Sequence, residues 1–196
     1  MKKFLIVVIV LVAVGVGIFA WGVSKYNGLV EKQESVETAW AQVENVYQRR
    51  MDLVPNLVNT VKGYAKHEKE TLDAVMSARA KATQMTVDVD DLSEENIRKF
   101  QEAQGELQQA MGRLMMITES YPDLKANENF LTLQSQLEGT ENRITVERQK
   151  FNETAKVYNT AVRKFPTSII ASMCDFEKKG YFEAQEGAEK APVVEF

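Results

Sequence analysis

Phe4 to Val23 form an apolar run without a charged residue. As a helix rising about 1.5 Å per residue, this run spans roughly 30 Å, which is the thickness of the hydrocarbon core of a bilayer. Beyond it, apolar and aromatic residues recur every three and four positions, which predicts a helical seam that leaves the membrane without a break. The members of the seam are Tyr26, Leu29, Val36, Trp40, Val43, Tyr47, Val54, Leu57, Val61 and Tyr64.

The three-four spacing keeps its phase from Tyr26 to Ala82, even across Pro55. Because a turn normally interrupts such a phase, this favours one long helix that is kinked at Pro55. The alternative is a chain reversal at Pro55, which would give two pieces of similar length to the next helix and therefore a four-helix bundle. The pattern weakly favours the kinked helix and leaves both open.

Two further long helices are predicted. A polar, acidic connection over 83–92 precedes Ser93, which caps a helix that ends at Tyr121-Pro122. Gly105 and Gly112 lie one heptad apart on it, which predicts close approach of another backbone. The third helix covers about 123–165 and carries a large apolar residue at every seventh position: Phe130, Leu137, Ile144, Phe151, Tyr158 and Phe165.

The end of the chain has a weaker pattern. Residues 167–176 are predicted as a short apolar helix, and Tyr181-Phe182-Glu183 as a segment that tucks onto the bundle end. The predicted fold is therefore all-α, an elongated antiparallel up-and-down bundle of three to four long segments. We divide the chain into a cytoplasmic start (1–3), a transmembrane anchor (4–23), a helical bundle (24–183) and a polar tail (184–196).

The distribution of charge indicates where these parts lie. Lys2, Lys3 and Lys25 are the only charged residues among the first 25, so the rest of the chain has 21 basic against 28 acidic residues. An acidic body argues against nucleic-acid binding, which depends on neutralising phosphates. Trp21 stands where a signal-peptide cleavage site would need small residues, which favours a retained helix. The lysines predict a cytoplasmic amino terminus and a body outside the cytoplasm, in the cell envelope.

Small residues form a stripe along the anchor: Ala13, Gly17, Ala20 and Ser24. Such a stripe lets two membrane helices approach closely, so these residues are candidates for helix association and a homo-oligomer. The alternative is that small residues are simply common in membrane helices.

Catalytic and metal-binding motifs are not recognisable. His67 is the only histidine and Cys174 the only cysteine, so a di-iron bundle site and conventional zinc sites lack their ligands. We therefore predict a non-enzymatic protein without a cofactor, and a hydrolase with an unrecognised site is the least favoured alternative.

The charged segment around Pro55 is a candidate partner or packing motif, formed by Arg49, Arg50, Asp52, Pro55 and Asn56. An ion pair on the helix surface is the alternative. Arg50 also occupies the seam of the first helix and Glu141 that of the third, so we hypothesise that they pair inside the bundle; the alternative is that both side chains reach solvent.

Several motifs resemble those of the LemA family of bacterial membrane proteins. They are the runs at 49–58, 61–64 and 137–144, with Tyr26-Asn27, Ala39-Trp40, His67-Glu68, Asn129-Phe130, Tyr158-Asn159 and Phe165-Pro166. The chain departs from the family at Cys174-Asp175-Phe176, where a glycine more often precedes the phenylalanine. The resemblance implies a single anchor and a helical bundle outside the cytoplasm, which favours four segments. It also implies an association with envelope maintenance and membrane proteases, and supplies no catalytic residues.

The sequence thus predicts a membrane-anchored helical scaffold or adaptor of the bacterial envelope that associates with itself and with protein partners. Membrane lipid is the partner of the amino-terminal helix. The second hypothesis is an accessory adaptor to a membrane protease in envelope stress.

Overall fold

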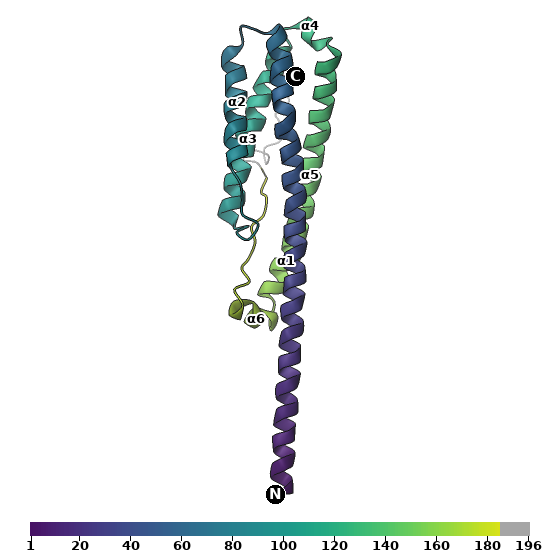
Figure 1. The fold of residues 1–196 in the computed structure, drawn as a ribbon, viewed down its shortest axis with the longest axis vertical. Helices are drawn as coiled ribbons and strands as arrows, with labels where there is room; N and C mark the ends of the chain where they lie inside the picture. The colour runs from purple at the N-terminus through teal and green to yellow at the C-terminus, as the bar shows by residue number, and fades with distance from the viewer. Residues whose placement is uncertain (185–196) are drawn as a thin grey trace, which may run out of the picture.

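The computed structural model describes residues 1–184, and every regular element in them is a helix. In chain order these are α1 (Lys2–Tyr64), α2 (Lys69–Gln84), α3 (Glu94–Thr118), α4 (Pro122–Lys125), α5 (Glu128–Arg163) and α6 (Thr167–Met173). α1 packs along α5 and against α2, and α2 packs on α3. These four long helices form an elongated antiparallel bundle, as predicted (Figure 1). The first part of α1 extends from the bundle as a bare stalk.

Pro55 lies inside α1, and the helix continues through it. The alternative of a chain reversal at Pro55 is therefore wrong. Proline has no N–H to donate to the carbonyl four residues earlier, which here belongs to Met51. The Nε of Arg79, on α2, donates to that oxygen at 2.8 Å. A side chain from the neighbouring helix thus replaces the hydrogen bond that Pro55 removes.

The chain reverses after Tyr64 instead, so the predicted unbroken helix to Ala82 is wrong. Lys66 and His67 are exposed in the turn, whereas Ala65 before it and Leu72 after it are buried in the same apolar cluster as Val61. The three-four spacing continues across the turn because both helices face one core. Apolar spacing reports which side is buried and does not report the direction of the chain.

The core has two parts along the long axis of the bundle. One cluster extends from Met51 and Val54 to Leu124 and Leu137 and is mainly aliphatic. The other is rich in aromatic residues, with Trp40, Tyr47, Phe100, Phe151 and Tyr158 among its members. Arg50 lies in sequence between Tyr47 of one cluster and Met51 of the other, and it is only 1% exposed. A polar layer therefore lies between the two apolar clusters.

The predicted cap of α3 at Ser93 is confirmed, whereas the predicted continuous third helix is wrong. The backbone N–H of Asn96 donates to Ser93 Oγ at 3.4 Å at the start of α3. The predicted third helix is divided into α4 and α5, and the side chain of Asn127 caps α5 by accepting from the Phe130 N–H at 3.0 Å. The predicted tail 184–196 lies, apart from Ala184, outside the described residues.

The predicted close approach at Gly105 and Gly112 is wrong. A Cβ added to either glycine would meet no atom within 4 Å among the described residues. Gly180 is the glycine that needs its lack of a side chain, since a Cβ there would lie 2.6 Å from the Glu94 Cα. The backbone that approaches α3 closely therefore comes from the carboxyl-terminal segment.

Candidate functional site

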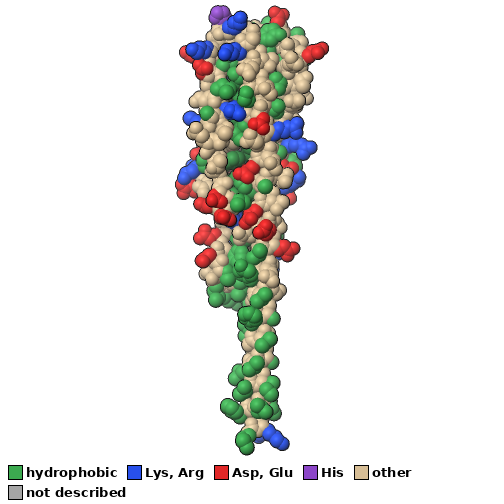
Figure 2. Space-filling view, viewed as in Figure 1, with side chains coloured by type: hydrophobic (Ala, Val, Ile, Leu, Met, Phe, Trp, Pro, Cys, Tyr) green, Lys and Arg blue, Asp and Glu red, His purple; other side chains and the backbone are tan. Residues whose placement is uncertain are grey.

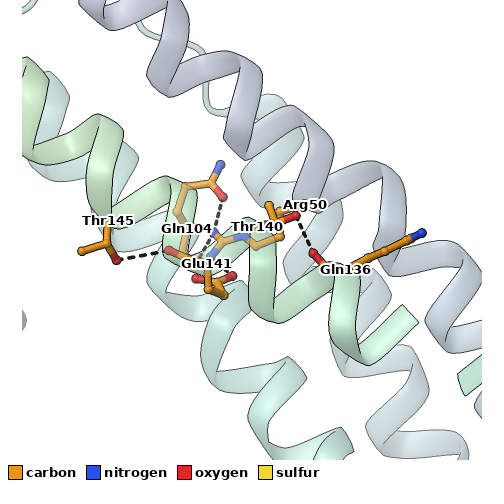
Figure 3. Close-up of polar contacts among 6 residues, drawn as sticks. All are labelled: Arg50, Gln104, Gln136, Thr140, Glu141 and Thr145. Carbon is orange, nitrogen blue, oxygen red and sulfur yellow. Dashed lines mark hydrogen bonds and ion pairs between the residues drawn. The ribbon is translucent and has the colours of Figure 1, made fainter. Parts of the chain in front are cut away.

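The polar layer is centred on Arg50 (Figure 3). Its Nη1 donates to Glu141 Oε1 at 3.0 Å, and its Nη2 donates to the backbone oxygen and to Oε1 of Gln104, at 3.1 and 2.6 Å. The guanidinium also lies 4.9 Å from the centre of the Tyr47 ring. The hypothesis that Arg50 pairs with Glu141 is confirmed, and the alternative that Arg50 reaches solvent is wrong. One side chain of α1 thereby joins α3 to α5.

Arg50 Nε and Gln104 Nε2 are both buried and have no hydrogen-bond partner among residues 1–184. Burial raises the pKa of the Tyr47 phenol, although Arg148 and Arg50 close by act in the opposite direction. Glu141 is the acidic partner, and its side chain is 32% exposed. Since an unpaired buried donor is costly, a group that brings oxygen acceptors would be bound favourably here.

A cavity of about 210 Å³ adjoins the layer. It lies between α3 and α5, and Arg50 and Tyr47 of α1 also line it. The residues of α3 and α5 that face it are mainly polar: Gln101, Gln104, Gly105, Gln108, Glu141, Thr145 and Arg148. The two buried donors without partners thus belong to residues on its wall.

Below this cavity, the carboxyl-terminal segment 177–184 runs without regular secondary structure between α3 and α5. Asn159 of α5 bonds both backbone groups of Lys179, donating at 2.8 Å and accepting at 2.9 Å. Asn152 does the same for Phe182, at 2.8 and 2.9 Å. A side-chain amide that donates to and accepts from one residue replaces the partners that a β-strand neighbour would supply.

The α3 side of the groove repeats the arrangement. Gln101 donates to the Glu183 carbonyl at 2.9 Å and accepts from its N–H at 3.2 Å. Arg148 donates to the same carbonyl at 2.8 Å, and the Gly180 N–H donates to the Leu92 carbonyl at 2.8 Å. We call the space between α3 and α5 that holds 177–184 and continues into the cavity the α3–α5 groove.

The spacing of the clamps matches that of an extended chain. Asn159 and Asn152 are one heptad apart, which is roughly 10 Å along a helix. They hold residues three positions apart, and three extended residues also span roughly 10 Å. One heptad further along, α5 presents Thr145 and α3 presents Gln108, and both line the cavity. The cavity therefore adjoins the end of the segment, since Gln101 and Arg148 line the cavity and also donate to the Glu183 carbonyl.

Phe182 anchors the segment in the aromatic cluster. Its ring stacks on Trp40 at 5.9 Å and contacts Phe151 edge-on at 5.5 Å, while the Arg148 guanidinium lies 4.9 Å from its centre. The predicted tucking of 181–183 is confirmed, but between two helices rather than at the bundle end. The sequence did not predict the asparagine clamps. The available signal was Asn159 itself, a polar residue beside Tyr158 on the apolar side of α5, which the structure shows to be 3% exposed.

With this geometry in view, the family can be assigned. The family model described as LemA family matches residues 39–196. The chain belongs to the LemA family. It is 25% identical to Protein LemA of Metamycoplasma hominis over 94% of this chain and 80% of that protein. It is also similar to Magnetosome protein MamQ of Magnetospirillum gryphiswaldense, with 25% identity over 87% of this chain and 68% of that protein. Magnetosome protein MamQ 2 of Paramagnetospirillum magneticum is 23% identical over the same shares.

Most of the motif beside Pro55 lies on the outside of this LemA-family chain. Arg49, Asp52 and Asn56 are exposed, and Asp52 accepts a hydrogen bond from Gln48 at 2.8 Å. Arg50 alone faces inward, and Pro55 is half-buried. The role of this motif as a partner site stays a prediction. So does helix association through Ala13, Gly17, Ala20 and Ser24, which are exposed along the stalk.

Within residues 1–184, no three His, Cys, Asp or Glu side chains gather as a group that could hold a metal ion. His67 is exposed at the α1–α2 turn, and Cys174 is exposed after α6.

Proposed function

We propose that this LemA-family protein is a membrane-anchored, non-enzymatic scaffold that holds an extended polypeptide segment of a protein partner in the open part of the α3–α5 groove. The observation that carries this proposal is the alignment of the cavity with segment 177–184. The same two helices that clamp backbone amides of that segment continue as a polar wall, on which buried donors have no partner among residues 1–184.

The anchor supports a scaffold role because it and the bundle share one helix. α1 has 63 residues, roughly 95 Å at the usual rise, and its apolar amino-terminal part is not buried against the body. That helix is long and apolar enough to cross a membrane. With the amino terminus in the cytoplasm, α1 would hold the groove at a fixed height above the extracytoplasmic surface of the membrane that it crosses. No linker separates the membrane-spanning part of α1 from the part in the bundle.

The chemistry of the open groove defines the partner. Backbone carbonyls are the acceptors that Gln104 Nε2 and Arg50 Nε lack, and an extended segment would present them at the spacing of the existing clamps. Arg148 and Arg50 add positive charge to a body that is otherwise acidic, and among the described residues that line the cavity Glu141 is the one acidic side chain. A neutral or acidic extended segment is therefore the occupant that we propose.

Site-specific photo-crosslinking in membranes tests this function. Thr145 lines the cavity, whereas Thr154 is half-buried on the same helix nine residues away, which is about two and a half turns and therefore the opposite face. Both hydroxyls donate to the carbonyl four residues earlier, so the two sites are locally matched. A photoreactive residue at 145 should capture a discrete protein that the one at 154 does not. Equal capture at both, or at neither, contradicts the proposed function.

The identity of the captured protein distinguishes self-association from the adaptor hypothesis. A product of twice the chain mass would support self-association, and a membrane protease would support the adaptor hypothesis. Self-association through the anchor is tested separately, by comparing the mass of the wild type with that of Gly17→Leu in detergent. A smaller oligomer for Gly17→Leu would support the small-residue stripe, and an unchanged mass would count against it.

A further inference from the structure

The short helix α6 lies beside α1 where the apolar stretch of α1 ends. Ile170 of α6 faces Gly22, where an added Cβ would be 3.8 Å from Ile170 Cδ1. After α6 the chain turns at Asp175, and the ring of Phe176 packs edge-on against Tyr26 at 5.5 Å. Two contacts on either side of Val23 thus fix the height of α6. In Figure 1 it stands at the lower end of the body, next to the stalk.

The other side of α6 exposes large apolar side chains. Ile169 and Met173 are 51% and 75% exposed, and Phe165, just before the helix, is 76% exposed. Ile169 and Met173 are four positions apart within α6, so they share one face of the helix. Ala171, by contrast, is 2% exposed. α6 therefore packs one side on the protein and leaves an apolar face uncovered.

Charge is excluded from this region. Residues 165–174 contain no charged side chain. Arg163 and Lys164 come immediately before the stretch, and Asp175, Glu177 and Lys178 follow it; all five are exposed. Figure 2 shows hydrophobic side chains continuing from the stalk to the lower end of the body, with most charged side chains gathered higher up. An apolar face bordered by charges on the body side is typical of an element at a membrane–water interface.

The occupant of this face is determined by its continuity with the stalk. If the run 4–23 of α1 lies in the hydrocarbon core, then Gly22 lies at its outer boundary, and α6 packed on Gly22 lies at the same depth. Trp21, 36% exposed, is of the residue type that favours that boundary. An uncharged apolar face held at this depth meets lipid before it meets any soluble partner.

We infer that α6 is a second membrane contact, a foot that lies in the outer interface of the bilayer with Phe165, Ile169 and Met173 inserted among the lipids. This inference rests on the proposed function, because it requires α1 to cross the membrane. The foot restricts the tilt and rotation of the bundle about α1, since a body fixed at two points cannot pivot freely on the membrane. The α3–α5 groove would then face a constant direction relative to the surface.

Depth measurements on the full-length protein in phosphatidylcholine vesicles test the foot. In a Cys174→Ser background, a fluorescent probe is attached to single cysteines introduced by Ile169→Cys or Met173→Cys. Val12→Cys, in the middle of the apolar run, reports whether α1 spans the bilayer. Ser120→Cys, exposed at the far end of the bundle, is the aqueous control. Spin-labelled lipid should quench the probes at 169 and 173 by at least about half as much as the probe at 12, and should leave the probe at 120 bright.

The outcomes separate the foot from the anchor. Quenching at 12 but not at 169 or 173 would overturn the foot and leave the proposed function intact. Absence of quenching at 12 would overturn both. Probes at 169 and 173 that are shielded from lipid and from an aqueous quencher alike would mean that protein covers α6, which also overturns the foot.

A matched pair of variants tests the role of the apolar face itself. With a probe on the natural Cys174, Ile169→Ser combined with Met173→Ser should reduce quenching by lipid several-fold. Val157→Ser, which removes an equally exposed apolar side chain from α5 (57% exposed), should leave quenching unchanged. If the double variant is quenched as strongly as the wild type, this face does not hold α6 in the membrane.

Discussion

A double-mutant cycle on Arg79 and Pro55 tests how α1 remains one helix. Without the proline N–H, the Met51 carbonyl depends on Arg79 Nε as its donor. Arg79→Met removes this donor and keeps most of the aliphatic stem, so the main loss is the hydrogen bond. Pro55→Ala restores an N–H that can donate to Met51 within the helix.

The expected magnitude follows from the character of this bond. The donor is a guanidinium, and a hydrogen bond to a charged group contributes about 1.5–3 kcal/mol when its removal leaves the partner unsatisfied. Because Arg79 is half-buried, water can partly replace it, and we expect Arg79→Met to lower the free energy of unfolding by about 1–2 kcal/mol. In the Pro55→Ala background the same change should cost less than about 0.5 kcal/mol.

The assay is urea unfolding of the full-length protein in detergent, in a Trp21→Phe background so that the fluorescence comes from Trp40 in the aromatic cluster. Arg98→Met is the control, since Arg98 lies exposed on α3 and pairs with Glu102 four residues away; it should cost less than about 0.5 kcal/mol. If Arg79→Met costs the same with Pro55 and with Ala at position 55, then Arg79 does not compensate for the proline and the reasoning is refuted.

Three further predictions concern the polar layer, a buried phenol and two glycines. Glu141→Leu should lower the free energy of unfolding by about 2–4 kcal/mol because it leaves Arg50 buried without its carboxylate. Arg50→Leu together with Glu141→Leu should cost less than the sum of the two single changes. Additive losses in denaturant unfolding would contradict the pairing. Burial raises the pKa of Tyr158 to about 12, above the value of about 10 for an unfolded chain, so the neutral phenol favours the folded state and this stability is lost as pH rises from about 10 to 12. Tyr158→Phe should therefore weaken the fall of the melting temperature over that range, and an unchanged slope would contradict the assignment. Gly105→Ala and Gly112→Ala should each stabilise the protein by up to about 1 kcal/mol, since an added Cβ meets no neighbour among the described residues at either position. Destabilisation in thermal melts would indicate that another backbone does approach these glycines closely.

Much of the fold could be predicted because helices bury one face at a regular period. The heptad row lies in the core from Phe130 to Tyr158 as expected, and Ser93 caps α3. The prediction is wrong for Phe165, the last member of the row, because α5 ends at Arg163 and Phe165 is 76% exposed. The pairing of Arg50 with Glu141 was also accessible, because opposite charges at seam positions of two antiparallel helices satisfy each other when buried. These inferences depend on local spacing, which the sequence displays directly.

The α1–α2 turn and the groove could not be predicted in the same way. The turn at 65–68 keeps the apolar spacing on both sides, so period alone did not reveal the reversal. The groove depends on contacts between side-chain amides of α5 and the backbone of residues 20 to 30 positions later, as for Asn159 with Lys179. Backbone atoms have no sequence pattern, so only the folded chain shows which segment the amides hold.

The central claim, that the open part of the α3–α5 groove holds a partner, is tested most directly by native mass spectrometry of the protein released from membrane nanodiscs. Gly105 lines the cavity, whereas Gly112, one heptad along the same helix, lies outside it. Gly105→Phe would therefore obstruct the groove, and Gly112→Phe is the matched control. All three chains carry Gly17→Leu, which removes any oligomer formed through the anchor. We predict that the chain with an unchanged groove and the chain with Gly112→Phe appear in a complex heavier than the 22.2 kDa chain, and that the chain with Gly105→Phe appears mainly alone. An unchanged groove found only at 22.2 kDa, or a complex that persists with Gly105→Phe, would contradict the account.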